Sequence, residues 1–130
     1  MLAENPWFSV TFDPLARVVR FRRTGLAVDD VDALGQLYAQ VRATFPVEAR
    51  GSMGLLVDMR DAPLRTDPRF QKIIVAEIPA LSAGWRRAAT LVQTEPGAHT
   101  VASLQKRAGV DSRVFVDEDA ALSWLLGVDD

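Results

Sequence analysis

Two aspartates, Asp58 and Asp61, have the residue type and spacing that most directly raise the question of chemistry. They lie at the end of an apolar run at residues 55–59, which is typical of a buried strand, and α/β sheets place their sites at the carboxyl ends of strands. Paired carboxylates can bind a metal ion or share a proton. No third ligand is evident in the sequence, so we favour the simpler interpretation that the pair closes a strand and turns the loop before Pro63.

Thr66 and Asp67 precede Pro68, at the start of a predicted helix. Aspartate is a preferred helix cap and proline suits the first helical position, so the pair predicts a helix start. A phosphate on Thr66 would be tolerated at a helix N-terminus and would alter a partner surface. Thr66 is therefore a candidate for phosphorylation, and capping by Asp67 is the alternative explanation of the same residues.

Other catalytic chemistry has little support in the sequence. The chain has no cysteine and a single histidine, His99, which excludes disulfides, thiolate metal sites and thiol catalysis. A lone histidine without a placed partner is a poor candidate for a base or a metal ligand. We therefore expect a protein that is not an enzyme and that needs neither a metal nor a cofactor.

The charge pattern bears on the partner class. Six arginines lie near the predicted hairpin and the fourth strand and could form a basic patch, namely Arg17, Arg20, Arg22, Arg23, Arg86 and Arg87. The formal net charge is nevertheless −2, and nucleic-acid binding usually needs a positive field with aromatic platforms. We expect no nucleic-acid partner. The sequence shows neither a leader pattern nor a membrane-spanning apolar stretch, so we expect a cytoplasmic protein.

The elements that position these residues follow from hydrophobic periodicity. The 130 residues, 48 % of them hydrophobic and 25 % charged, predict a single domain over residues 1–130. Period-2 and apolar runs predict strands at 7–12, 16–22, 55–59, 88–94 and 114–116, and helical spacing predicts helices at 31–45, 68–81, 101–108 and 118–126. The order β-β-α-β-α-β-α-β-α predicts an α/β fold with a mixed, mostly parallel five-stranded sheet and four helices.

Local signals set the expected ends of these elements. Asp29 or Asp30 should cap the first helix, and Asp117 should cap the last. Pro79 should kink or end the second helix. The dipeptide at 96–97, Pro-Gly, should turn the chain before the third helix.

Two stretches carry a resemblance to a known family. The strand end V-D-M-R-D at 57–61 and the closing pattern V-F-x-D-x-x-x-A-L-x-W-L at 114–125 resemble STAS-like domains, the SpoIIAA-like family of bacterial anti-sigma-factor antagonists, which are grouped near SEC14-type lipid-binding domains. The resemblance covers nearly the whole chain. Signalling members carry an Asp-Ser-Ser-Gly-like segment with a phosphorylated serine, whereas this chain has Arg-Thr-Asp-Pro at 65–68.

The resemblance implies a regulatory domain that acts through protein–protein interaction, without the usual phosphorylatable serine. The helix at 68–81 is broadly apolar, which fits a partner, a homodimer or a lipid groove as well as it fits deep burial. We predict a partner-binding surface made of Asp58, Arg60, Asp61, Thr66, Asp67, Phe70 and Ile74. The alternative is a SEC14-like carrier of a small hydrophobe or lipid, which needs an apolar cavity of about 300–1,000 Å³ and which a filled core would exclude.

Overall fold

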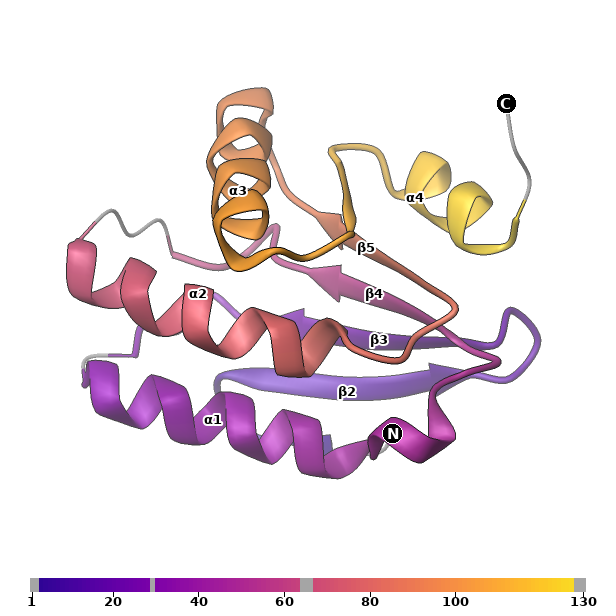
Figure 1. Ribbon diagram of the computed structural model, residues 1–130, viewed down its shortest axis with the longest axis horizontal. Coiled ribbons are helices and arrows are strands. Elements are labelled where there is room, and N and C mark those ends of the chain that lie inside the picture. Colours follow the sequence, from indigo (N-terminus) through magenta and orange to yellow (C-terminus); the bar gives the residue numbers. More distant parts are fainter. Residues whose placement is uncertain (1–2, 29, 64–66, 128–130) are drawn as a thin grey trace.

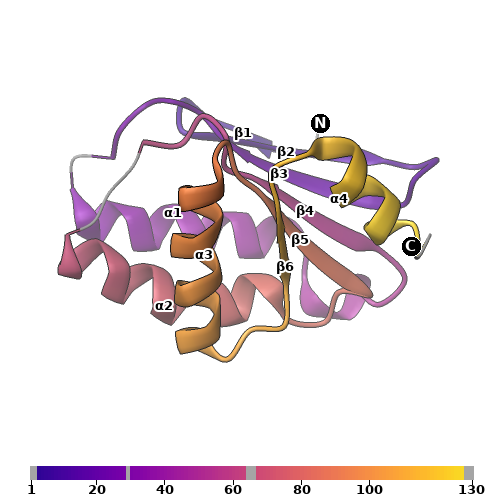
Figure 2. The same cartoon turned by 90° about the horizontal axis from the view of Figure 1, so that it is seen from above.

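The computed structural model describes residues 3–28, 30–63 and 67–127. These residues form a six-stranded sheet with three helices on one face and one on the other (Figures 1 and 2). The elements in chain order are β1 (Ala3–Glu4), β2 (Phe8–Asp13), β3 (Val18–Arg23), α1 (Val31–Thr44), the 3₁₀ helix η1 (Val47–Ala49), β4 (Gly54–Asp58), α2 (Pro68–Ser82), β5 (Arg87–Leu91), α3 (Glu95–Ala108), β6 (Arg113–Phe115) and α4 (Glu118–Leu125).

The strands lie in the sheet in their chain order, β1 to β6. The strands β1, β2 and β3 pair antiparallel, and β3 to β6 pair parallel. The predicted mixed α/β sheet with an opening hairpin is therefore confirmed. The sheet has one strand more than expected among the described residues, because the two-residue β1 pairs with the outer edge of β2. A strand of two residues is too short to show a period-2 pattern.

Side-chain alternation along β3 divides the core in two. Val19 and Phe21 lie under α1 and α2 with Leu55 of β4, and Val18 lies on the opposite face in the cluster that α4 covers. Because α4 covers only part of that face, Arg20 is half-buried and Arg22 is exposed there. This division matches the alternation in the sequence.

The predicted N-terminal caps of α1 and α2 are confirmed. The side chain of Asp30 accepts a hydrogen bond from the amide of Asp32 at the start of α1. The side chain of Asp67 accepts one from the amide of Phe70 at the start of α2. Thr66 lies outside the described residues, so nothing in the structure tests its modification.

Of three further local predictions, one is wrong and two are met only in part. The helix α2 ends at Ser82, three residues after Pro79, so the exposed proline lies in its last turn; a kink at Pro79 stays a prediction. The Pro-Gly dipeptide at 96–97 lies in the first turn of α3, because Thr94 caps the helix by accepting a hydrogen bond from the amide of residue 97. Asp117 occupies the cap position of α4, but its side chain makes no capping hydrogen bond.

Candidate functional site

Four charged side chains meet where β3, the end of β4 and the start of α4 come together, and we call Arg20, Asp58, Arg60 and Glu118 the charge cluster. The Asp58 side chain is 3 % exposed. Arg60 binds its carboxylate with two nitrogens, Nε to Oδ1 at 3.0 Å and Nη2 to Oδ2 at 2.8 Å. Glu118 accepts from Arg60 Nη2 at 2.8 Å and from Arg20 Nη1 at 3.3 Å. The cluster thus ties α4 to the strands.

The electrostatics of the charge cluster keep its members ionised. Burial alone would raise the pKa of Asp58, but the hydrogen bonds and charge of Arg60, helped by Arg20, lower it below its usual range. The hydrogen bond from Arg20 likewise lowers the pKa of Glu118, and bonding to Asp58 raises that of Arg60. Two cations balance two anions, so the cluster stabilises the fold and holds no proton poised for transfer.

Asp58 and Asp61 do not form the paired carboxylates that their spacing allowed. Asp61 is exposed and binds Arg22, with Nη2 to Oδ2 at 2.7 Å, while Asp58 is buried in the charge cluster. Within the part of the chain that the structure describes, no group of three or more histidine, cysteine or acidic residues could hold a metal ion. Each aspartate therefore has an arginine partner of its own.

The residues of the predicted partner surface lie at different depths. Asp58 and Ile74 are buried, and Asp67 and Phe70 are half-buried at the start of α2. Asp61 is exposed, and the side chain of Arg60 is 39 % exposed. The accessible part is thus narrower than the sequence indicated, and partner binding through it stays a prediction.

The predicted basic patch is divided by the packing of its members. Arg20 belongs to the charge cluster, and Arg23 is buried on the face that α1 to α3 cover. Arg86 and Arg87 donate to the carbonyls of Leu125 and Trp124 at the end of α4. These guanidinium groups hold parts of the fold together, so no single basic face forms from the six arginines.

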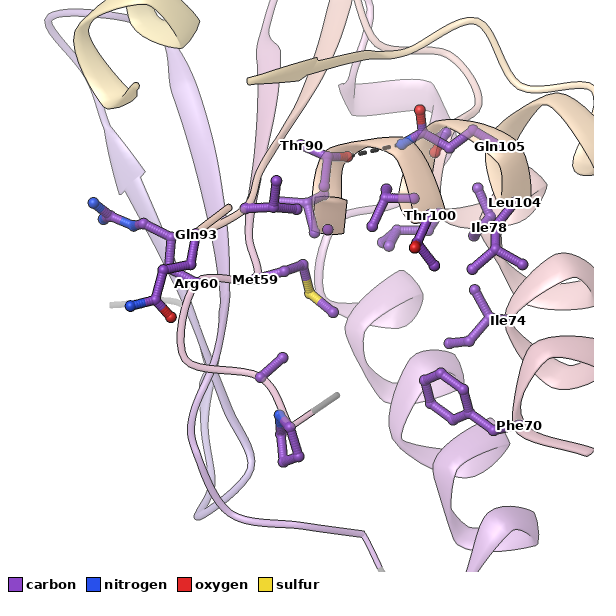
Figure 3. A pocket seen from close by; sticks show the side chains of 18 of the residues that line it. Met59, Arg60, Phe70, Ile74, Ile78, Thr90, Gln93, Thr100, Leu104 and Gln105 are labelled. Carbon is purple, nitrogen blue, oxygen red and sulfur yellow. Dashed lines mark hydrogen bonds between the residues drawn. The ribbon is translucent and has the colours of Figure 1, made fainter. Parts of the chain in front are cut away.

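A cavity of about 200 Å³ lies between α2, α3 and the carboxyl ends of β4 and β5 (Figure 3). Its wall is mainly apolar, with Met59 after β4, Phe70, Ile74 and Ile78 on α2, and Leu104 on α3. The burial of Ile74 and Leu81, and the partial burial of Phe70 and Ile78, explain much of the apolar excess of α2. The cavity side of the same helix, with Phe70, Ile74 and Ile78, borders empty space.

Polar groups stand at the margins of the cavity. Gln105 Nε2 donates to Thr90 Oγ1 at 2.9 Å, which satisfies two buried side chains in its wall. Figure 3 shows the guanidinium of Arg60 directed away from the apolar side chains, so that only its stem lines the cavity. Sequence reasoning missed Thr90 and Gln105, because each lies in an ordinary strand or helix pattern. The broadly apolar sequence of α2 was the one feature that indicated this cavity.

Comparisons with known proteins bear on the fold. No protein-family model matches the chain, and no curated protein matches it significantly. Its structure is similar to the crystal structure of an uncharacterized DUF3478-family protein from Shewanella loihica PV-4, which has a SpoIIAA-like fold. The match covers 96 % of this chain and 99 % of that chain, with a TM-score of 0.59 and 15 % sequence identity.

The chain has a SpoIIAA-like fold. The fold class and the STAS-like resemblance expected from the sequence are therefore confirmed at the level of architecture. At this sequence identity the similarity carries no function from one protein to the other. Among the described residues of this SpoIIAA-like chain, none of the helices has the length and apolar character needed to cross a membrane.

Proposed function

We propose that this SpoIIAA-like chain is a non-catalytic binding protein whose ligand is a small apolar molecule held between α2, α3 and the sheet. The observation that carries the proposal is the apolar cavity of about 200 Å³. This volume is below the range of about 300–1,000 Å³ expected of a SEC14-like carrier and of sites for drug-sized ligands, so the proposed ligand is smaller than theirs. A dry engineered cavity of about 150 Å³ takes up benzene, which makes a single aromatic ring or a short acyl chain a suitable occupant.

The physical basis is the incomplete packing of Ile74, Ile78 and Leu104. Side chains that border empty apolar space lack van der Waals partners on one side, and an apolar ligand restores these contacts. The same ligand leaves water, which is favourable in proportion to its apolar area. Catalysis is not needed to explain the site, because the charged residues beside it neutralise each other in the charge cluster.

A toluene titration followed by ¹H–¹⁵N correlation spectra tests the proposal. We expect amide shifts confined to the cavity wall, at residues such as Ile74, Thr90 and Leu104. Val92 is buried and lines the cavity, so Val92→Phe should fill part of it and weaken toluene binding by roughly tenfold or more. Val47→Phe is the matched control, because Val47 is exposed on η1, and it should bind toluene as the wild type does.

Two results would overturn the proposal. One is the absence of saturable shifts at the cavity wall up to the solubility limit of toluene. The other is unchanged toluene binding by a folded Val92→Phe variant.

A second candidate is the regulatory protein–protein interaction that the STAS-like resemblance implies. It is supported by the accessible pair Arg60 and Asp61, which lie next to the cavity-lining residues Met59 and Ala62 in the chain. A homodimer through this region is compatible with either function. Charge reversal at both positions together with Phe70→Ala should abolish partner binding, and intact binding by the folded triple variant would remove this candidate.

A further inference from the structure

A buried cation lies beside the cavity. Arg23, at the end of β3, is 7 % exposed. Its Nη1 donates to the carbonyl of Trp7 at 2.6 Å, and its Nη2 reaches the carbonyl of Leu26 only at 3.5 Å. No carboxylate of the described residues pairs with it. The other buried arginine, Arg50, donates to four carbonyls, so Arg23 is much less well compensated.

A buried phenol accompanies this cation. Tyr38 of α1 is 5 % exposed, and its hydroxyl makes no hydrogen bond to a described residue. Among these residues no fully buried polar side-chain atom lacks a partner, so this hydroxyl borders accessible space. Burial raises the pKa of Tyr38 to about 12. The positive charge of Arg23 opposes this shift, and the negative charge of Glu77 adds to it. Glu77 itself is engaged with Arg42, Nη1 to Oε2 at 2.6 Å. The tyrosine is therefore a neutral donor without an acceptor.

Arg23 and Tyr38 both line a second cavity, of about 20 Å³. Space of this size holds about one water-sized group. Its wall shares Tyr38, Met59 and Phe70 with the larger cavity, so the two are adjacent. Met59 has a flexible thioether side chain, and its rotation would join them. The larger apolar cavity thus adjoins a small space whose mainly apolar wall includes the cationic residue Arg23 and the hydroxyl-bearing residue Tyr38.

A buried charge without an ionic partner is costly, and an anion beside it offsets that cost. A carboxylate accepts hydrogen bonds from guanidinium and hydroxyl donors and is planar and small. We propose that the ligand of this chain is an amphipathic carboxylate, with its apolar body in the larger cavity and one carboxylate oxygen in the smaller cavity, against Arg23 and Tyr38. This inference rests on the proposed function and specifies the class of ligand.

Three probes with one eight-carbon chain separate head-group recognition from apolar binding. Octanoate, octan-1-ol and octylamine are titrated by calorimetry at pH 7.4, with ¹H–¹⁵N spectra to locate each one. We expect octanoate to bind about tenfold more tightly than octan-1-ol, because charge-assisted hydrogen bonds are the stronger ones. Octylamine should bind more weakly than octan-1-ol, because its cation meets Arg23.

Substitutions in the wall of the smaller cavity assign the preference to Arg23 and Tyr38. Tyr38→Phe removes one hydroxyl and should reduce octanoate affinity several-fold while leaving octan-1-ol within about twofold. Arg23→Met keeps an unbranched stem and should abolish the preference for octanoate. Lys72→Met is the control for loss of one positive charge, because Lys72 is exposed on α2, and it should retain the preference. Tyr38→Phe preserves the test if Arg23→Met does not fold.

The outcomes separate this inference from the function on which it rests. Equal binding of octanoate and octan-1-ol at the cavity wall would overturn the carboxylate assignment and leave the apolar site intact. An octanoate preference that survives in folded Tyr38→Phe and Arg23→Met variants would overturn it as well. If neither toluene nor any of the three probes binds at the cavity, both the carboxylate assignment and the proposed apolar binding function are overturned.

Discussion

Asp58→Asn is expected to lower the free energy of unfolding at pH 7 by about 3 kcal/mol, because removing one partner of a buried ion pair leaves the others uncompensated. The variant keeps the size of the side chain but removes the charge that Arg60 and Arg20 contact at 2.8 and 3.3 Å. Urea unfolding followed by circular dichroism measures the difference. Asp61→Asn is the matched control, since its pair with Arg22 is about half exposed and should contribute less than about 1 kcal/mol.

The pH dependence gives this prediction a second readout. The folded-state pKa of Asp58 is lowered, so its stabilisation is fully present above the unfolded-state pKa of about 3.9 and is lost as the pH falls through the folded-state value. The difference between the wild type and Asp58→Asn should therefore be largest at neutral pH and shrink below about pH 4. A difference that stays constant down to acid pH would show that the charge of Asp58 is not what stabilises the fold.

Arg50→Met is expected to cost about 3 kcal/mol of unfolding free energy, since carbonyls that lose a buried partner each carry a desolvation penalty. Arg50 is 1 % exposed, donates to the carbonyls of Ala80, Leu81 and Ala83 at the end of α2, and its guanidinium carbon lies 4.9 Å from the centre of the Trp85 ring. Its Nε donates to the carbonyl of Phe45. The loss of stability should appear in the same urea unfolding experiment.

Two comparisons define the role of Arg50. Arg17→Met is the control, because Arg17 is exposed and donates to Ser52, and it should change stability by less than about 0.5 kcal/mol. Arg50→Lys should fall between the two, since an ammonium group cannot match the fork of a guanidinium. A loss below about 1 kcal/mol for Arg50→Met would contradict its role as the common cap of the ends of α1 and α2.

The charge cluster and the cavity share Arg60. Its stem lines the cavity wall, and its guanidinium binds Asp58 and Glu118. The wall is therefore fixed in position by ion pairs on the far side of the sheet. The charged end of β4, which the sequence suggested as a catalytic or metal site, therefore has a structural role: its side chains hold the cavity wall in place.

Much of the fold could be predicted because its signals are local. The starts of α1 and α2 depend on Asp30 and Asp67, whose side chains bond amides two and three residues away. The faces of β3 follow from alternation alone. By contrast, Pro96 was misjudged because proline followed by glycine is typical of turns, although the proline also suits the first turn of a helix that Thr94 caps.

The candidate site was less predictable because it is made by packing between distant residues. Ile74, Thr90 and Leu104 come from three elements, and the volume left between them depends on how closely those elements approach. Arg50 was missed for a similar reason, since a loop arginine gives no sign of the carbonyls about 30 positions later that it binds. Glu118 lies in the first turn of α4, and its ion pairs with Arg20 and Arg60 depend on the position of that helix against the sheet.

Diffraction from crystals of this protein pressurised with xenon tests whether the space between α2, α3 and the sheet is a dry apolar site, because xenon occupies dry apolar cavities. We predict a xenon atom in contact with Met59, Ile74 and Leu104 in the wild type, and none there in Val92→Phe. Ordered water filling that space, or xenon only at other places in the molecule, would contradict an apolar ligand site between α2, α3 and the sheet.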